Sequence, residues 1–205
     1  MNIVLKYMIV ILFSYLVGTS SMSLYLAKLK GVNIREKGSK NLGASNAMIL
    51  MGWKAGILVG IHDIGKAALA VILAKTFFPD SSYIGAVAGV AAVIGHIFPF
   101  YLKFKGGKGF ASFIGMALAI HWKCALILML VVVVVTLITD YIVVGTMTTI
   151  LSFPAYMGYQ SHDYILPLII LIASLVIIYK HRENLVRIYK GTEIGFRSAN
   201  RGDHR

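Results

Sequence analysis

One short stretch of the sequence joins three glycines to three lysines, a composition suited to holding a phosphate. It reads Lys103-Phe104-Lys105-Gly106-Gly107-Lys108-Gly109. Glycine permits positive φ and close backbone approach, and each lysine supplies a compact positive charge for a phosphate oxygen. The G-x-x-x-x-G-K-[ST] spacing of a nucleotide P-loop is absent. A basic loop drawn to anionic lipid headgroups is the alternative, but that attraction needs lysines and not glycines. We therefore predict a phosphate site here.

A second stretch combines small residues with hydroxyl and amide side chains, directly before an apolar run. It reads Gly38-Ser39-Lys40-Asn41-Leu42-Gly43-Ala44-Ser45-Asn46. Such a loop exposes backbone N–H groups and small donors to an anion. It is equally compatible with an ordinary turn in which Ser45 or Asn46 caps the next helix.

Ionisable residues also occur inside the apolar segments. Asp63 and Lys66 are i,i+3 neighbours, and His96 precedes the glycine and lysine stretch. Charges within a membrane span are unfavourable enough to be paired or functional, so a structural ion pair and a substrate-facing role both fit. A lone histidine among apolar residues is usually a packing residue.

The third polar stretch, residues 181–193, follows the last apolar segment. His181 and Asn184 share one helix face at i,i+3, while Glu183 and Arg187 are spaced to pair at i,i+4. On its own this pattern is typical of a solvated helix end. The six histidines are scattered and the one cysteine is Cys124, so the sequence predicts neither a metal centre nor a disulfide.

The elements that must position these residues are helices in a membrane. Of the 205 residues, 58% are hydrophobic and only 14% are charged, which excludes an ordinary soluble domain. A span needs about 20 apolar residues as helix. We predict an all-α, polytopic membrane protein with about seven helical segments: 3–27, 52–76, 83–102, 110–121, 124–139, 141–159 and 164–180. Residues 110–121 are short for a span, and His121-Trp122-Lys123 is a candidate interfacial break. The chain shows no repeat or linker and is predicted to be one membrane domain, 1–205.

The net charge is +12, and the basic residues are distributed as the positive-inside rule predicts. Most Lys and Arg residues lie in 28–50, 103–108 and 180–205, between or after apolar runs. These stretches are predicted to be cytoplasmic, with the N-terminus outside and the C-terminus in the cytoplasm. Nucleic-acid binding is disfavoured, because the basic residues flank membrane segments.

The three polar stretches together resemble motifs of the bacterial membrane glycerol-3-phosphate acyltransferases that use acyl phosphate as donor. The family patterns are G-S-G-N-x-G-A-T-N, then G-H-x-F-P with F-K-G-G-K-G, then H-R-E-N with G-x-E. Here they are matched in order by residues 38–46, by 95–99 with 104–109, and by 181–184 with 191–193. The resemblance covers essentially the whole chain.

This resemblance implies a multi-pass enzyme of phospholipid synthesis in the bacterial inner membrane, with its active site facing the cytoplasm. It would make lysophosphatidic acid from acyl phosphate and glycerol 3-phosphate, with no cofactor, metal or nucleic acid. The predicted catalytic residues are Ser39, His181 and Asn184, while Glu193 would be structural. The predicted substrate-binding residues are Lys40, Asn41, Gly43, Asn46, Lys66, His96, Lys105, Gly106, Gly107, Lys108 and Gly109. The proton acceptor could be His181, His96, the leaving phosphate or the acceptor's own phosphate.

The sequence departs from the family pattern at several polar positions. Ile49 stands where a first-motif arginine is expected, and Lys40 replaces a glycine. Asp140 and Val143 stand where the family tends to have a basic residue and a serine. These changes keep two alternatives open: the same fold with another small acceptor or weaker activity, and a non-catalytic lipid-binding or transport protein.

Overall fold

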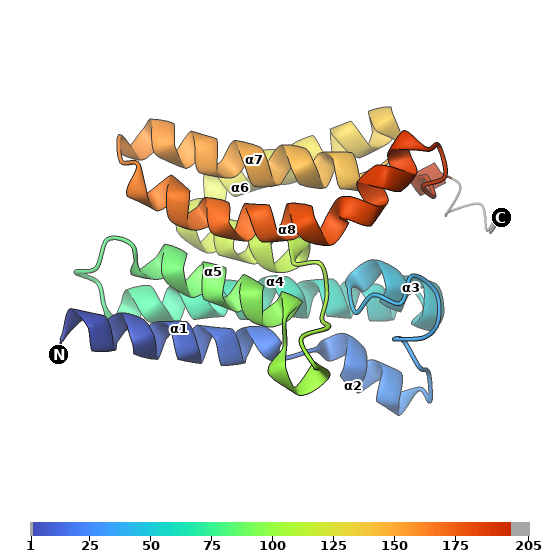
Figure 1. The fold of residues 1–205 in the computed structure, drawn as a ribbon, viewed down its shortest axis with the longest axis horizontal. Coiled ribbons are helices and arrows are strands. Elements are labelled where there is room, and N and C mark those ends of the chain that lie inside the picture. The colour runs from blue at the N-terminus through green and yellow to red at the C-terminus, as the bar shows by residue number, and fades with distance from the viewer. Residues whose placement is uncertain (1, 198–205) are drawn as a thin grey trace. The chain divides into compact units, whose positions relative to one another are not determined.

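The structure is a computed structural model that describes residues 2–197 (Figure 1). Within that range every regular element is helical, as predicted. The elements are α1 (Ile3–Thr19), α2 (Met22–Leu29), α3 (Ala44–Met51), α4 (Trp53–Phe77), α5 (Ile84–Ile97), the 3-10 turn η1 (Phe100–Leu102), α6 (Phe110–Thr139), α7 (Ile142–Ser161) and α8 (Ile165–Tyr189).

Six helical stretches of the described chain are long and apolar enough to cross a bilayer. They are Ile3–Leu29, Trp53–Phe77, Ile84–Leu102, Phe110–Thr139, Ile142–Ser161 and Ile165–Tyr189. Many of their large apolar side chains are exposed, which is the arrangement expected of a surface solvated by lipid. The prediction of a multi-pass α-helical membrane protein is therefore confirmed.

The fourth helical stretch contains the break that the sequence suggested. His121 has non-helical backbone angles of φ −149° and ψ 82°, so Phe110–Thr139 is two helices that meet at His121, as the predicted segments 110–121 and 124–139 require. Nδ1 of His121 accepts the backbone N–H of Cys124 at 3.2 Å and so satisfies an amide that the kink releases. The chain forms two compact units that divide here, Met1–Ile120 and His121–Arg205.

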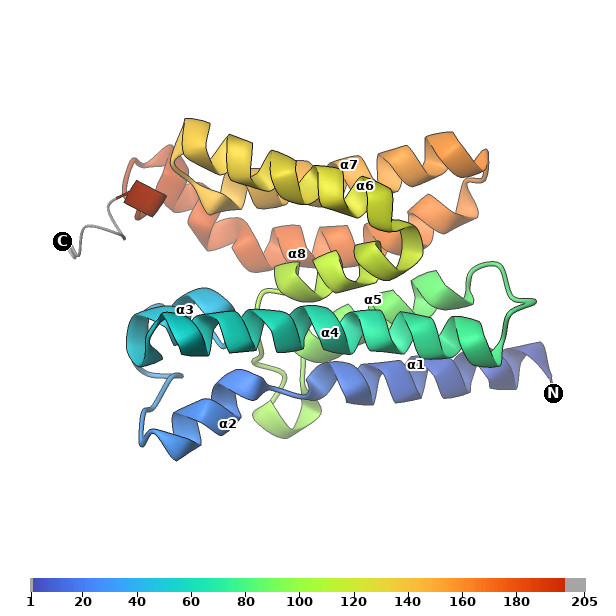
Figure 2. The same cartoon turned by 180° about the vertical axis from the view of Figure 1, so that it is seen from behind.

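In the first unit, α1, α4 and α5 lie against one another (Figures 1 and 2). Two glycines allow α1 and α5 to approach closely. A Cβ on Gly18 would overlap the Ala92 carbonyl, and a Cβ on Gly95 would overlap the Tyr15 carbonyl. Small residues at helix contacts are typical of membrane proteins, where van der Waals packing replaces the hydrophobic driving force.

The first span is not the continuous helix that the sequence predicted. It stops at Thr19 and restarts at Met22, with Ser20 and Ser21 in extended conformations. The short helix α3 was also not predicted as a separate element. It is joined to α4 through Gly52, which has a φ of +90°.

In the second unit, α7 and α8 pack together. Ser174 on α8 donates a hydrogen bond of 2.6 Å to the Ile150 carbonyl on α7. After α8 the described chain continues to Arg197 without leaving this unit, because Phe196 bonds to the turn between α6 and α7.

Candidate active site

The glycine and lysine stretch folds over the end of α5. Gly106 donates its backbone N–H to the Ile97 carbonyl at 3.0 Å, and Gly107 donates to the His96 carbonyl at 3.1 Å. A Cβ on Gly106 would overlap the His96 carbonyl, and one on Gly107 would overlap the His96 imidazole. Gly109 has a φ of +95°. The glycines are thus required by backbone approach and conformation, for the reason the sequence suggested.

The lysines of this loop differ in exposure. Lys103 and Lys105 are exposed, Lys108 is half-buried, and Gly107 and Gly109 are buried. The loop therefore has buried backbone glycines beneath a set of cationic side chains. This arrangement suits the binding of an anion, because the lysine ammonium groups can contact it while the tightly folded backbone stays fixed.

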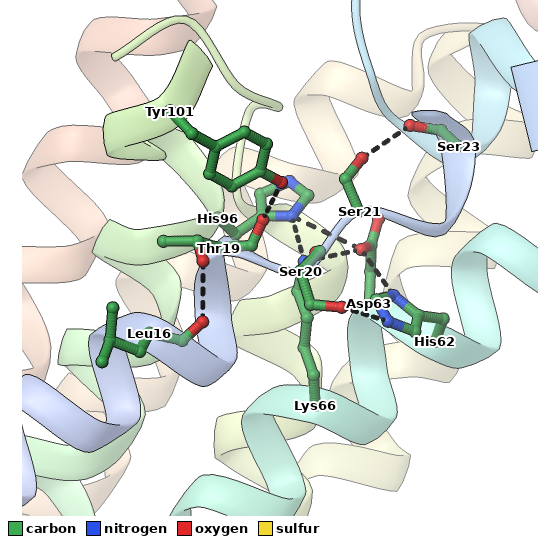
Figure 3. A network of polar contacts seen from close by, with 10 residues as sticks. All are labelled: Leu16, Thr19, Ser20, Ser21, Ser23, His62, Asp63, Lys66, His96 and Tyr101. Carbon is green, nitrogen blue, oxygen red and sulfur yellow. Dashed lines mark hydrogen bonds and ion pairs between the residues drawn. The ribbon is translucent and has the colours of Figure 1, made fainter. Parts of the chain in front are cut away.

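A buried polar network joins His96 on α5 to α4 and to the break after α1 (Figure 3). Lys66 Nζ is 2.9 Å from Asp63 Oδ1, 2.9 Å from His96 Nδ1 and 2.6 Å from the Ser20 carbonyl oxygen. His62 Nε2 lies 2.9 Å from Ser20 Oγ. Asp63, Lys66 and His96 are only 2%, 6% and 8% exposed. The sequence-predicted ion pair on one helix face is therefore present, and it extends to a third buried group.

This network satisfies the backbone groups that the break in the first span releases. In lipid such groups must find internal partners. The Lys66 ammonium donates to the Ser20 carbonyl. The Tyr101 hydroxyl donates to the Thr19 carbonyl at 2.6 Å, and the Thr19 hydroxyl donates to the Leu16 carbonyl at 2.7 Å. Sequence reasoning missed the roles of Ser20 and Tyr101, because nothing local marked the break.

The contacts of Lys66 and His96 define what each can do. An ammonium has three donors, and those of Lys66 have three partners in Asp63, His96 and the Ser20 carbonyl. Nδ1 of His96 lies 2.9 Å from this ammonium and 3.4 Å from Asp63 Oδ1. Since an ammonium only donates, the shorter contact favours Nδ1 as an acceptor, with the ring proton on Nε2. That atom faces Gly107. The geometry favours a positioning role for Lys66 and favours His96 as a donor rather than a base.

The second polar stretch is organised by Asn46, which is fully buried on α3. Its Oδ1 accepts the Ser39 backbone N–H at 2.9 Å, and its Nδ2 lies 3.1 Å from the Ile34 carbonyl and 2.9 Å from the Asn41 carbonyl. A Cβ on Gly38, whose φ is +60°, would overlap Asn46 Oδ1. Asn46 therefore shapes this loop. It does not cap α3, because the N-cap residue is Gly43.

The other residues predicted in this loop are accessible. Ser39 and Lys40 are exposed, and Asn41 and Gly43 are partly exposed. Lys40 has a φ of 56°, in the left-handed region that glycine normally occupies. The loop presents a hydroxyl, an amide and a cation on a fixed backbone.

In the second unit, α8 carries His181 and Asn184 as predicted, and both are buried rather than solvated. His181 Nδ1 lies 2.9 Å from the Ile177 carbonyl, so this nitrogen carries the proton and Nε2 is the basic atom of the neutral ring. Asn184 Nδ2 donates to Glu193 Oε1 at 2.6 Å.

The predicted ion pair between Glu183 and Arg187 at the end of α8 is not formed. Arg187 pairs with Glu193, with 2.6 Å between Nε and Oε2, and not with Glu183. Glu183 instead lies 3.8 Å from the Arg182 guanidinium on the surface. The chain turns back after α8, so Glu193 reaches Arg187 with better geometry than a neighbour on the same helix. No cluster of three or more His, Cys, Asp or Glu side chains suited to a metal occurs in the described part of the chain.

Comparison with known proteins gives one consistent result. The family model described as glycerol-3-phosphate acyltransferase matches residues 8–191. Glycerol-3-phosphate acyltransferase 1 of Oceanobacillus iheyensis is 39% identical over 191 residues, covering 89% of this chain and 91% of that protein. The glycerol-3-phosphate acyltransferase of Aquifex aeolicus is 32% identical, covering 94% of this chain and 100% of that protein.

Two solved structures are also similar. Both are crystal structures of PlsY (YgiH), described as an integral membrane glycerol 3-phosphate acyltransferase. The glycerol 3-phosphate form has a TM-score of 0.88 and 31% identity, covering 95% of this chain and 97% of that one. The lysophosphatidic acid form has a TM-score of 0.85 and 31% identity, covering 92% and 94%.

Proposed function

The chain belongs to the glycerol-3-phosphate acyltransferase family, and from this we infer that it transfers an acyl chain from acyl phosphate to the sn-1 hydroxyl of glycerol 3-phosphate. The products are lysophosphatidic acid and inorganic phosphate. The observation that carries this proposal is the likeness of nearly the whole chain to a structure in the glycerol 3-phosphate form. We further infer that residues 1–205 act as one membrane domain, which the span of the family model over both units supports.

The chemistry requires positioning more than a strong protein nucleophile. The acceptor oxygen forms a bond to the acyl carbon, the bond from that carbon to the phosphate oxygen breaks, and phosphate leaves. Because both reactants carry a phosphate, neutralising charge and holding the two reactants in line can supply much of the rate. No cofactor is needed for any of these bond changes.

Two sets of residues are assigned to the substrates. The glycine and lysine loop, with Lys105, Lys108 and residues 106, 107 and 109, would hold the phosphate of glycerol 3-phosphate. The loop before α3 would contribute the Ser39 hydroxyl together with Lys40, Asn41 and Gly43. The exposure of Ser39, Lys40 and Lys105 and the fixed backbone of the two loops support this assignment.

Three residues predicted to bind substrate are better explained as positioning residues. Asn46 holds the loop that carries Ser39, and Lys66 orients His96. His96 in turn holds Gly107 through its carbonyl oxygen and places its Nε2 against that residue. Asp63, which was not among the predicted site residues, belongs to the same set because it pairs with Lys66.

The proton of the acceptor hydroxyl has two suitable destinations. One is Nε2 of His181, which is basic because Nδ1 donates to the Ile177 carbonyl. The other is a phosphate oxygen of either substrate. His96 is not a candidate, since Lys66 already donates to its basic nitrogen. We assign the transfer to His181, with Asn184 one turn later on the same face of α8.

We place the reaction at the cytoplasmic face of a bacterial inner membrane. The basic stretches that contain the proposed site, 28–50, 103–108 and 180–205, support this placement through the positive-inside rule. Lipid contact follows from the exposed apolar side chains of the spans, and an acyl phosphate would reach the site with its chain in that apolar environment.

The deciding experiment is acyl transfer by the purified protein in detergent, with palmitoyl phosphate and radiolabelled glycerol 3-phosphate. We expect labelled lysophosphatidic acid from the acyl phosphate and none when palmitoyl-CoA is the donor. Consumption of acyl phosphate without labelled product would overturn the assignment of the acceptor. Product from the CoA ester alone would overturn the assignment of the donor.

A further inference from the structure

The segment after α8 returns to the helix it has just left. The backbone N–H groups of Thr192 and Glu193 both bond to the Arg187 carbonyl, at 2.8 and 3.2 Å. This turn carries the Glu193 carboxylate back to α8, where one oxygen accepts from Asn184 and the other from Arg187, each at 2.6 Å. The side chain of Glu193 is only 11% exposed. We call residues 193–197 the C-terminal strap.

The far end of the strap is anchored by one residue, Asp140, in the turn between α6 and α7. Its backbone carbonyl accepts the Phe196 N–H at 2.7 Å, and its Oδ1 accepts the Arg197 N–H at 2.9 Å. The Arg197 guanidinium donates to the Leu137 carbonyl at 2.6 Å, near the end of α6. A Cβ on Gly195 would overlap Asp140 Oδ2. The strap therefore lies directly on the Asp140 carboxylate.

We propose that Asp140 is a positioning residue for acyl transfer, because it anchors the strap that holds Glu193 against Asn184. This inference rests on the proposed function, in which Asn184 belongs to the site. The Asp140 anchor in the turn between α6 and α7 and the turn after α8 fix both ends of the strap, so Glu193 is held from two sides. The amide of Asn184 is then fixed in one orientation, with Nδ2 toward Glu193 and Oδ1 turned away from it.

The backbone at position 140 also suits an aspartate. Asp140 has a φ of 68°. Aspartate tolerates the left-handed region better than most residues and adds an acceptor for a backbone N–H. Asp140 therefore fits both the conformation of the turn and the contact with the strap.

Two substitutions separate the carboxylate from the backbone geometry. Asp140→Asn keeps both an acceptor oxygen and tolerance of positive φ, while Asp140→Gly keeps only the tolerance. We expect Asp140→Gly to lower kcat/KM for glycerol 3-phosphate about tenfold or more, since small misplacements of site groups have large effects on rate. Asp140→Asn should restore activity to near that of the unmodified protein.

Hydrogen exchange measured by mass spectrometry reports on the strap directly. Exchange in a peptide covering 193–197 should be faster in Asp140→Gly and unchanged in Asp140→Asn, while peptides from α7 and α8 stay protected. This readout does not depend on substrate. If wild-type protein shows no acyl transfer, the proposed function fails, but the exchange data still test the anchor.

A double-mutant cycle with Gly195→Ala adds an independent test. The added methyl group should displace the strap in the wild-type background, where it meets the Asp140 carboxylate, and should have little effect in the Asp140→Gly background. Equal losses of activity in both backgrounds would overturn the contact. Normal kcat/KM in Asp140→Gly together with faster strap exchange would overturn the positioning role and leave only a structural one.

Discussion

Lys66 Nζ lies 2.9 Å from His96 Nδ1, and this contact joins the break in the first membrane span to the loop proposed to hold phosphate. The same ammonium bonds to the Ser20 carbonyl, which the break releases. The His96 carbonyl accepts the N–H of Gly107. One buried lysine therefore supports an irregular backbone within the span and orients the imidazole on which the loop folds.

Replacing Lys66 by Met should destabilise the protein and weaken its use of glycerol 3-phosphate. The substitution leaves the Asp63 carboxylate buried without its lysine, and removal of one partner of a buried pair typically costs about 3–5 kcal/mol. It also removes the donor that fixes the His96 ring. Thermal unfolding in detergent should show a lower midpoint, and kinetics should show a raised KM for glycerol 3-phosphate.

The double variant Asp63→Asn, Lys66→Met is the control for the unpaired charge. It should recover much of the lost thermal stability, because no isolated charge remains, while the raised KM persists. A Lys66→Met protein with unchanged unfolding and unchanged KM would show that the network neither stabilises the fold nor positions the loop.

Gly107→Ala should abolish most of the activity. Its Cβ would overlap the buried His96 imidazole, so either the loop or the ring must move. We expect kcat/KM to fall by about a hundredfold, in the range that small misplacements of binding groups produce. Steady-state assays with palmitoyl phosphate would measure the effect.

Gly65→Ala is the matched control for that change. Gly65 is exposed on α4 and a Cβ there would meet nothing within 4 Å, so the alanine should leave activity intact. If both alanine variants lose activity equally, the close approach at Gly107 does not explain the loss.

The sequence predicted the helical segments and the glycine requirement of the loop, because both depend on local composition. Hydropathy marks a span, and a run of glycines beside lysines marks a tight basic turn. The kink at His121 also had a local signal in its polar neighbours. By contrast, the break at Ser20 had no such signal, since what permits it is a lysine on another helix.

The roles of individual polar residues were harder to predict for the same reason. Asn46 and Lys66 have side chains typical of substrate contact, but their partners are backbone carbonyls far along the chain. The pairing of Arg187 with Glu193 depends on a turn beyond the helix that helical spacing does not describe. Such contacts follow from tertiary structure, and only the candidate residues, not their partners, are visible in the sequence.

Ser39→Ala and Asn46→Ala should affect the protein in different ways. Ser39 is exposed, so loss of its hydroxyl should lower kcat without changing thermal unfolding. Asn46 is fully buried and bonded to several loop backbone groups, so alanine there should destabilise the protein by about 2 kcal/mol or more and also remove activity. Ser45→Ala, an exposed neighbour on α3, should change neither quantity. An Asn46→Ala protein with normal unfolding and a raised KM alone would instead make Asn46 a direct substrate ligand.

His181→Ala should act on the chemical step. If Nε2 of His181 accepts the proton of the acceptor hydroxyl, its loss should lower kcat by about a hundredfold or more, within the usual range for general-base catalysis, with little change in KM. His181→Gln, which retains polarity without a basic nitrogen, should be equally slow. A raised KM with nearly normal kcat in both variants would assign the proton to a substrate phosphate and leave His181 a binding residue.

Ile49→Arg should improve the use of glycerol 3-phosphate. Ile49 stands where the resemblance to the family pattern led us to expect an arginine. It lies on α3 and is 55% exposed, so an arginine fits there without repacking. Guanidinium groups bind phosphate through paired, charge-assisted hydrogen bonds, which the single ammonium of Lys40 does not reproduce. We expect KM for glycerol 3-phosphate to fall by roughly three- to tenfold with little change in kcat, as expected for one added charge-assisted contact at an accessible site. Ile49→Gln is the neutral control and should leave KM unchanged. An unchanged KM in Ile49→Arg would mean that this chain binds its acceptor without a cation at position 49, and equal gains in both variants would assign the effect to polarity rather than to charge.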